Sequence, residues 1–503
     1  MTTEATLATL FSEPLERENP ALVSPEDDEV ITYAALEQNV LGLAGRLAGA
    51  GVERGDRVAL VLPNGPEFVQ ILLAVTTLGA AAAPLNPAYT VDEHAFYLDD
   101  LQPRVLLVPA GEMQAARQAA GAGMAIIDVS VSDDSLPDLA VDGRRIEDER
   151  PFDAGVGDDI ALLLHTSGTT SRPKQVPLLQ RNLMASARTI ASHYALGPGD
   201  VSYVAMPLFH VHGLVASVLG ALAAGGAAIA PRRFSAQRFW GQARAHEATW
   251  FSAGPTLHQM IVDKRAEQIA PASLRFIRSC SSAMSPALMQ RLEDIYRVPL
   301  LEAYGMTEAS HQMASNPLPP QPRVPGSVGV PTGTEIRVVD RGGADVSAGS
   351  PGEVVIRGAG VTPGYLNNPD AIAEAFKHGW FHTGDRGLLE NGYLRLEGRL
   401  KEMILRGGEN VSPYEIEEVL LAHPAVTDAV CFAIDDELYG EEVAAAVVIG
   451  APADERLLRE HCRERLAAFK VPKTIRIVPE IPRTATGKLQ RRRVAAMLDR
   501  AGR

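Results

Sequence analysis

The chain has 503 residues, which is enough for at least two domains that each bury a core. Hydrophobic residues make up 46% and charged residues 22%, and this balance excludes wholesale disorder. The 62 acidic residues outnumber the 47 basic ones, and the formal net charge of −15 argues against nucleic acid or an anionic membrane as the main partner. An anion must therefore be bound at a local site.

Cysteine usage and the N-terminal sequence both favour a cytoplasmic protein. Cys280, Cys431 and Cys462 are widely spaced and odd in number, which fits a reducing compartment and offers neither a disulfide framework nor a zinc pattern. The N-terminal stretch MTTEATLATLFSE has acidic residues and no basic region before an apolar one, so we expect no signal peptide. The uncharged run at 210–231 approaches membrane-spanning length, but it is rich in Ala and Gly, and we predict a buried helix followed by a buried strand.

The first two thirds of the chain alternate short apolar strands with helical stretches. RVALVLPNG leads into PEFVQILLAVTTLG, RVLLVPA follows, and SLRFIRSCSS leads into PALMQRLEDIYRVPLLEAYG. Strands that alternate with helices predict parallel α/β sheets covered on both faces.

Near residue 325 the alternation of strands and helices gives way to short strands divided by Gly and Asp, as in TEIRVVD, GEVVIRG and GYLRLEGR. This pattern predicts an antiparallel or barrel-like subdomain. After it, IEEVLLAHPAVTDAVCFAID, EEVAAAVVIG and LLREHCRERLAAF indicate a small α+β unit. The predicted fold is therefore α/β, with a large N-terminal domain at 1–398, whose barrel-like part starts near 325, and a small mobile C-terminal domain at 399–503.

The stretch HTSGTTSRPK at 165–174 concentrates groups that suit phosphate. Gly168 permits backbone angles closed to other residues, the neighbouring Ser and Thr residues offer hydroxyl and N–H donors, and Lys174 adds a positive charge. The Walker pattern GxxxxGK[ST] is absent, so this would be another kind of phosphate loop. Taken alone, the stretch fits a plain polar loop after a strand equally well.

Five stretches together resemble the ordered motifs of one superfamily. HTSGTTSRPKQVPL, LEAYGMTEA, WFHTGD, EGRLKEMILRGGENVSPYEIE and PRTATGKLQ are similar, in this order, to motifs of the adenylate-forming superfamily. That superfamily includes acyl-CoA synthetases, peptide-synthetase adenylation domains and firefly luciferase. The resemblance implies an enzyme that joins a carboxylate to the α-phosphate of ATP, releases pyrophosphate and passes the acyl group to the thiol of coenzyme A.

The resemblance implies a role for each motif residue in nucleotide binding. The loop at 166–170 with Lys174 would hold the β- and γ-phosphates, Glu308 would bind Mg2+, and Thr307 would contact the α-phosphate. Tyr304 would lie against the adenine, while the ribose hydroxyls would donate to Asp385, with Arg399 beside it. Standing alone, such residues are more often a core tyrosine, a turn or a solvated arginine. The implied ATP-binding residues are Thr166, Ser167, Gly168, Thr169, Thr170, Lys174, Glu302, Ala303, Tyr304, Gly305, Thr307, Asp385, Arg399 and Lys488.

Three further assignments rest on the C-terminal motifs. Lys488 would be the catalytic lysine that bridges the attacking carboxylate and the α-phosphate, although a lysine in such a Thr- and Gly-rich segment is otherwise an exposed tail residue. Lys401 matches a hinge between two poses of the C-terminal domain, and Gly407 and Gly408 match a loop that lines the coenzyme A tunnel. The arginines at 491–493 are predicted to be surface charge.

One residue departs from the superfamily pattern. The phosphate loop usually continues Pro-Lys-Gly, whereas this chain has Gln175 after Lys174. If the usual glycine takes a positive φ, Gln175 would be strained; if it only begins the next strand, nothing is lost.

The segments that would face the acid favour a small polar substrate. They contain His210, His212, Ser281 and His311 and few bulky aliphatic residues, and a second carboxylate needs such donors once it leaves water. His212 could equally be a hydrogen-bonded packing residue. The sequences of these segments resemble those of the oxalyl-CoA synthetases of plants and yeast. This resemblance implies that His210, Ser281 and His311 hold the carboxylates of oxalate.

Other functions remain open at this point. Malonyl-CoA synthetases share the SNP after the YGMTE motif but normally carry an arginine where this chain has Ala303, which weakens malonate as the substrate. A ligase that loads a carrier-protein thiol would need a carrier domain, and none follows Lys488. A non-catalytic nucleotide-binding regulator would have lost Lys488 or Glu308, and both are present. We expect ATP, Mg2+, coenzyme A and an acid as ligands, no nucleic-acid or membrane partner, and a monomer or homodimer.

Overall fold

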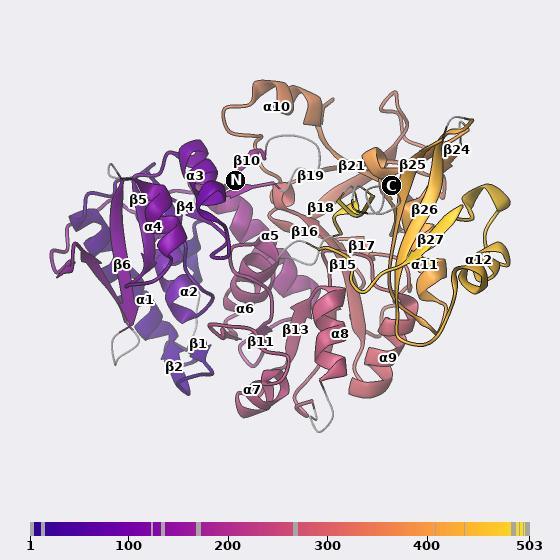
Figure 1. Cartoon of the computed structure of the whole chain (residues 1–503). Helices are drawn as coiled ribbons and strands as arrows, with labels where there is room; N and C mark the ends of the chain where they lie inside the picture. Colours follow the sequence, from indigo (N-terminus) through magenta and orange to yellow (C-terminus); the bar gives the residue numbers. More distant parts are fainter. Residues whose placement is uncertain are drawn as a thin grey trace.

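In the computed structural model, the described residues form four sheets, which follow one another from the indigo side of the molecule to the yellow side (Figure 1). Parallel strands dominate the two large sheets and antiparallel strands the two small ones. The α/β class predicted from the sequence is therefore confirmed. The described residues are 5–11, 16–121, 124–131, 136–166, 173–264, 270–407, 409–436, 438–483, 489–491, 493–495 and 497.

The eight-stranded sheet has a parallel centre and antiparallel edges. Its strand order is β10-β9-β4-β3-β5-β6-β7-β8, and the helices between β3, β4, β5 and β6 are the crossovers that parallel strands require. The strands and helix predicted at 57–110 are confirmed as β3, α2 and β5. The strands are β3 (Arg57–Leu60), β4 (Ala81–Pro84), β5 (Val105–Pro109), β6 (Ala125–Val131), β7 (Pro137–Val141), β8 (Arg144–Arg145), β9 (Ile160–His165) and β10 (Gln175–Leu179), and the helices are η1 (Leu7–Phe11), α1 (Tyr33–Gly49), α2 (Pro66–Thr77), α3 (Val91–Leu101) and α4 (Gln114–Ala120).

The nine-stranded sheet is parallel from β15 to β1, in the order β17-β16-β15-β14-β13-β11-β12-β1-β2. Its outer strands β2, β16 and β17 run antiparallel to their neighbours. Its strands are β1 (Pro20–Ser24), β2 (Glu29–Thr32), β11 (Val201–Val204), β12 (Ala227–Ile229), β13 (Trp250–Ala253), β14 (Phe276–Ser279), β15 (Leu300–Met306), β16 (His311–Ser315) and β17 (Val330–Pro331), and its helices are α5 (Gln180–His193), the π-helix η2 (His212–Leu219), α6 (Gly220–Leu222), α7 (Phe239–Ala245), α8 (Pro255–Asp263), α9 (Pro286–Tyr296) and η3 (Thr307–Ala309).

Two smaller antiparallel sheets complete the chain. The first pairs β18, β19, β21 and β22 in antiparallel register, as predicted for the region after residue 325. The second pairs β23, β24, β25 and β26, with β27 added in parallel and the helices α11 and α12 nearby. The elements are β18 (Thr334–Val339), β19 (Gly352–Gly358), α10 (Pro369–Ala375), β20 (Phe376–Lys377), β21 (Trp380–Glu390), β22 (Tyr393–Arg399), η4 (Leu400–Glu402), β23 (Ile404–Arg406), β24 (Glu409–Val411), α11 (Pro413–Leu421), β25 (Val426–Asp436), β26 (Gly440–Ile449), α12 (Glu455–Arg463), η5 (Ala468–Lys470) and β27 (Thr474–Ile477).

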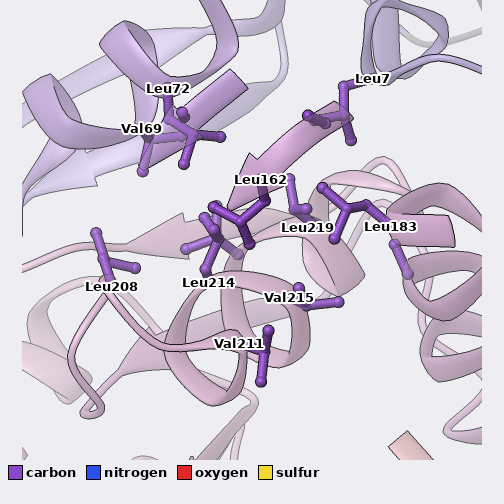
Figure 2. Close-up of a cluster of buried hydrophobic side chains, with 14 of the residues drawn as sticks. Leu7, Val69, Leu72, Leu162, Leu183, Leu208, Val211, Leu214, Val215 and Leu219 are labelled. Atoms are coloured by element: carbon purple, nitrogen blue, oxygen red, sulfur yellow. The ribbon is translucent and has the colours of Figure 1, made fainter. Parts of the chain in front are cut away.

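One apolar cluster joins the two large sheets (Figure 2). Val69 and Leu72 come from α2, Leu162 comes from β9, and Leu214 and Leu219 come from the π-helix, and all five side chains are fully buried. Burying a side chain of this kind contributes about 1.5–3 kcal/mol, so this cluster fixes the π-helix between the two sheets.

The apolar run at 210–231 forms the buried helix and strand that the sequence predicts. It contains the π-helix, α6 and β12, and the residues of all three elements are buried. In the part of the chain that the structure describes, no helix is both long enough and apolar enough to cross a membrane. A π-helix is rare and often marks a functional site, and this one begins at His212.

Two glycines before β17 provide a test of backbone packing. Gly329 has a φ of +86°, and a Cβ there would lie 1.8 Å from the carbonyl carbon of Ser315, whereas Gly326 has a φ of +74° with nothing within 4 Å of its Cβ position. We expect Gly326→Ala to cost about 1–2 kcal/mol from backbone strain alone. Gly329→Ala should lower the stability by at least ~3 kcal/mol, because the strand backbone must also move. Urea denaturation of both variants measures the loss of stability. Equal losses in the two variants would contradict the predicted collision of a Cβ at position 329 with the backbone of Ser315.

Candidate active site

The central strands of the nine-stranded sheet bring the candidate residues to one edge. β13, β14 and β15 pair in parallel, so their carboxyl ends lie together, which is where open α/β sheets bind ligands. Ser281 follows β14, and Thr307 and Glu308 follow β15 in the short helix η3. His311 begins β16 and pairs with Met306 at the end of β15. Four of the predicted residues, Ser281, Thr307, Glu308 and His311, therefore lie at this edge.

Tyr304, Asp385 and Arg399 form one hydrogen-bonded chain. The Tyr304 hydroxyl donates to Asp385 Oδ2, and Arg399 Nε lies 2.7 Å from Asp385 Oδ1. Direct pairing of Asp385 with Arg399 across β21 and β22 sets this contact. Burial raises the pKa of Tyr304 well above its ordinary value, and the Asp385 charge raises the pKa of Arg399. The tyrosine therefore stays a neutral donor beside a stable ion pair.

Small residues let β15 and β16 approach each other beside Tyr304. A Cβ at Gly305 would lie 2.2 Å from the His311 carbonyl oxygen, so glycine is required there. Ala303 is buried and pairs with Ser315. The buried Glu302 side chain accepts a hydrogen bond from the Gly326 N–H at 3.3 Å.

A tyrosine connects the predicted metal ligand with the predicted phosphate-loop lysine. The Tyr365 hydroxyl donates to Glu308 Oε1 at 3.0 Å, and Lys174 Nζ lies 4.7 Å from the centroid of the Tyr365 ring. Burial, followed by the charge of Glu308, raises the pKa of Tyr365, so the hydroxyl keeps its hydrogen. Our sequence analysis missed Tyr365, because one tyrosine in a Gly-Tyr turn gives no signal of its own.

Gln175 is tied into the base of the predicted phosphate loop. It pairs with His165 across β10 and β9, in ordinary strand geometry, and its Nε2 donates to Asp100 Oδ2 at 2.7 Å. His165 Nε2 donates to the same carboxylate oxygen at 2.9 Å. Just beyond this pair, the Thr166 N–H donates to the Lys174 carbonyl at 2.9 Å. The strain considered for Gln175 is therefore absent, and its side chain anchors the loop base to α3.

Several predicted residues lie outside the described part of the chain. They are Ser167, Gly168, Thr169 and Thr170 of the phosphate loop, Gly408 of the coenzyme A loop, and Lys488.

The acid-facing residues Ser281 and His311 both contact a network that includes His212. His212 Nδ1 lies 2.8 Å from Ser281 Oγ, and the rings of His212 and His311 stack at 5.0 Å between centroids. Burial, with the Arg278 charge next, lowers the pKa of His212 well below its ordinary value. His210 is half-buried before the π-helix, with its ring 4.7 Å from that of Phe209.

Arg278 of β14 is the centre of this network, and our sequence analysis missed it. The side chain is fully buried, and no carboxylate of the described residues forms an ion pair with it. One signal was available: an arginine between apolar residues in a strand that should be buried on both faces. Its hydrogen-bond partners are Tyr194, Ser252, His212, His311 and Gln312, at 2.8, 2.8, 3.4, 2.9 and 3.0 Å.

The C-terminal motifs lie in and around the smaller α+β sheet. Lys401 is exposed in η4, and Gly407 has a φ of +56° with its N–H donating to the Tyr439 carbonyl. The prediction of surface charge is wrong for Arg491, which is only 7% exposed and forms ion pairs with Glu402 and Glu417. Burial of Glu417 makes a buried counter-charge necessary, and Arg491 supplies it.

The sheets and the residues gathered at their edge define an enzyme of the adenylate-forming class. The family model of the AMP-binding enzyme matches residues 14–366, and that of the AMP-binding enzyme C-terminal domain matches residues 415–488. The chain belongs to the AMP-binding enzyme family. It is an AMP-forming acid–CoA ligase, and ATP, coenzyme A and a carboxylic acid fit as its substrates.

Relatives of this chain include two oxalate–CoA ligases. The protein of Arabidopsis thaliana is 46% identical over 92% of this chain and 93% of its own length, and that of Saccharomyces cerevisiae is 38% identical over 100% and 99%. Among solved structures, ATP-bound MatB of Rhodopseudomonas palustris superposes with a TM-score of 0.89 at 29% identity, over 98% of this chain and 99% of that one. The likeness extends over nearly the whole chain in all three cases.

The buried Glu302 makes the stability of the site depend on pH. Burial raises its pKa to about 7, above the ordinary value of 4.5 for a glutamate. The folded state therefore binds the proton more tightly than the unfolded state, and this contribution to stability is present below about pH 4.5 and is lost as the pH rises through 7. We expect Glu302→Gln to be more stable than the wild type at pH 8.5 and to match it near pH 4.5.

Thermal unfolding of both proteins across this range measures the difference. Glu147→Gln, at an exposed position, is the control and should leave the pH dependence unchanged. A constant difference between Glu302→Gln and wild type at all pH values would contradict the titration of Glu302.

Proposed function

We propose that this chain is an oxalate–CoA ligase. The observation that carries this proposal is the fully buried Arg278, which has polar but uncharged partners among the described residues. A buried positive charge without a counter-ion favours a ligand with a second negative group. A fatty acyl chain would instead leave the surrounding polar side chains without partners. The names of the two oxalate–CoA ligase relatives support the same substrate.

In the first half-reaction, a carboxylate oxygen of the acid attacks the α-phosphorus of ATP, and the bond to the departing pyrophosphate breaks. Tyr304 lies against the adenine, and Asp385 accepts from the ribose hydroxyls beside Arg399. Thr307 contacts the α-phosphate, and Lys488 neutralises both the carboxylate and the α-phosphate as charge moves between them. The ion pair between the buried Asp385 and the half-buried Arg399 supports this assignment, because it fixes the ribose acceptor before the nucleotide binds.

The departing pyrophosphate carries the β- and γ-phosphates, and its negative charge requires positive charge at the phosphate end of the nucleotide. The loop at 166–170 with Lys174 holds the β- and γ-phosphates in this proposal. Glu308 fits a Mg2+ ligand, because its buried carboxylate faces Lys174 through Tyr365 and forms no close ion pair with a cation of the described residues. Bound Mg2+, which typically takes one or two carboxylates plus phosphate oxygens, would neutralise phosphate charge there.

In the second half-reaction, the thiol of coenzyme A attacks the acyl carbon and AMP leaves. We propose that the C-terminal domain turns about Lys401 between the half-reactions, and that Gly407 and Gly408 then line the passage for the thiol arm. The exposure of Lys401 and the positive φ of Gly407 are compatible with these roles. All three cysteines are free and buried, which supports a reducing, cytoplasmic location.

Malonate remains the second candidate substrate. The solved MatB structure shares the fold, but Ala303 stands where malonyl-CoA synthetases normally carry an arginine, and the buried positive charge near the proposed acid site comes from Arg278 instead. A longer diacid would also have to fit beside the stacked histidines, His212 and His311. Below malonate we rank other short or medium-chain acids. A carrier-protein thiol in place of coenzyme A ranks below malonate as well.

The substrate is tested by the product formed from ATP, Mg2+ and coenzyme A with different acids. We expect kcat/KM for oxalate to exceed that for malonate, acetate, a medium-chain fatty acid and an aromatic acid by at least about 100-fold, because the monoacids lack the second carboxylate that the donor network needs and malonate is longer by one carbon. Pyrophosphate release gives the rates, and mass spectrometry identifies the CoA thioester. Preference for a fatty or aromatic acid would keep the ligase and overturn the oxalate assignment.

Lys488→Ala separates the two half-reactions. We expect the rate of acyl-adenylate formation to fall at least about 100-fold, since the charge at the α-phosphate is no longer neutralised, while thioester formation from a supplied acyl-adenylate survives. Lys473→Ala, which removes an exposed lysine paired with Asp436, is the matched control and should affect neither step. Equal loss of both half-reactions in Lys488→Ala would contradict the assignment.

A further inference from the structure

One chain of hydrogen bonds runs from Arg278 to Ser281. Arg278 Nη1 lies 2.8 Å from Ser252 Oγ, Ser252 Oγ lies 2.7 Å from His212 Nε2, and His212 Nδ1 lies 2.8 Å from Ser281 Oγ. The first contact is set by the sheet, because Ser252 of β13 and Arg278 of β14 are paired directly across their parallel strands. The chain thus begins inside the sheet and ends at its carboxyl edge.

Only one direction of donation fits all three contacts. A guanidinium donates hydrogen bonds and never accepts them, and Arg278 Nη1 lies 2.8 Å from Ser252 Oγ and 3.4 Å from His212 Nε2. Both atoms therefore accept from Arg278, and Ser252 gives its own hydrogen to His212 Nε2. His212 therefore carries its hydrogen on Nδ1 and donates to Ser281 Oγ. A second branch behaves alike: His311 Nε2 lies 2.9 Å from Arg278 Nη2 and must accept from it. One arginine thus fixes the tautomers of both stacked rings.

The groups around His212 keep the imidazole neutral. Arg278 faces it from β14, His258 from α8, His210 from the segment before the π-helix, and His311 from β16. Burial is the largest cause of the low pKa of His212, and the Arg278 charge is the next. Because Nε2 of the neutral ring accepts from Arg278, His212 donates from Nδ1, and the direction of the chain does not reverse near neutral pH.

The last member, Ser281, is left with a hydrogen to donate. Its oxygen already accepts from His212, and the residue is half-buried at the end of β14. Its φ of +79° is unusual for serine, and such strain at about 1–3 kcal/mol is typical of functional sites. The Ser281 hydroxyl can therefore donate to an acceptor at the strand edge.

We propose that Arg278 is a positioning residue for the acid: through Ser252 and His212 it sets Ser281 as a hydrogen-bond donor, and the site thereby selects small acids whose second group is an acceptor-only anion, a carboxylate or a sulfonate. This inference rests on the proposed acid site and deepens it. Arg278 acts without touching the acid, since all its N–H groups have protein partners.

A double-mutant cycle tests the chain of hydrogen bonds from Arg278 to Ser281 without removing the buried charge of Arg278. Ser252→Ala breaks the chain between Arg278 and His212, and Ser281→Ala removes its last donor. We expect each to raise KM for oxalate about tenfold with KM for ATP unchanged, and the double variant to be no worse than Ser281→Ala alone, because both act on one chain. If the two increases of KM add up in the double variant, the chain of hydrogen bonds is contradicted.

Ser279→Ala is the matched control. Ser279 lies on the same strand, and its buried hydroxyl has no hydrogen-bond partner among the described residues. Its substitution should leave KM for oxalate and the preference of oxalate over acetate unchanged. A tenfold rise of KM in this variant too would mean that any change in β14 disturbs the site, and would overturn the specific role of the chain.

The tautomer of His212 gives a readout that does not depend on the acid. In protein with 15N-labelled histidine, the His212 signal, assigned by its loss in His212→Asn, should show the Nδ1–H tautomer from pH 6 to 8 and a mixture in Ser252→Ala. An Nε2–H tautomer in the wild type would overturn the inference even if oxalate is the preferred acid. If another acid is preferred while the Nδ1–H form is found, the oxalate assignment fails and the positioning role stands.

Discussion

A positive charge buried in the middle of a sheet constrains the elements around it. Removing a guanidinium from water costs several kcal/mol unless every N–H group finds an acceptor. Arg278 meets this requirement with partners from the end of α5, from β13, from the π-helix and from β16, none of which can shift alone without leaving a donor unpaired. The cluster in Figure 2 also packs against the π-helix. The proposed acid site is therefore shaped before the acid arrives.

The proposed nucleotide-binding part of the site depends on contacts between the two large sheets. Thr362 links the two large sheets at this point, since its hydroxyl donates to the Pro177 carbonyl of β10 at 2.6 Å and its N–H donates to the Glu308 carbonyl at 2.7 Å. Tyr365, three residues later, bridges the side chains of Glu308 and Lys174. The segment between β19 and α10 therefore sets the distance between the proposed metal ligand and the phosphate loop, although it carries no catalytic group.

The sequence predicted the layers and the motif residues but not the charges that compensate one another. Strand–helix alternation was enough for the parallel sheets, and the pairing of Asp385 with Arg399 followed from two adjacent motifs. Arg278 and Arg491 were missed for one reason: a local pattern shows that an arginine is present, whereas its burial depends on partners far away in the chain. Arg491 pairs with a glutamate 74 positions away, and Arg278 with a histidine 33 positions away. Gln175 likewise depends on α3, about 75 residues earlier.

The position of Arg491 determines what a rotation about Lys401 would move. Its partners Glu402, Glu417 and the Cys431 carbonyl all follow Lys401 in the chain, so the ion-pair cluster would travel intact. Because Leu489 forms a bridge with Arg483, the described residues on either side of 484–488 would travel with it. Among the described residues, α11 contacts β22, where the Ser412 hydroxyl donates to the Glu397 carbonyl, and such contacts would have to break. Buried charge would therefore hold the proposed moving unit together, while contacts like this one hold it in place.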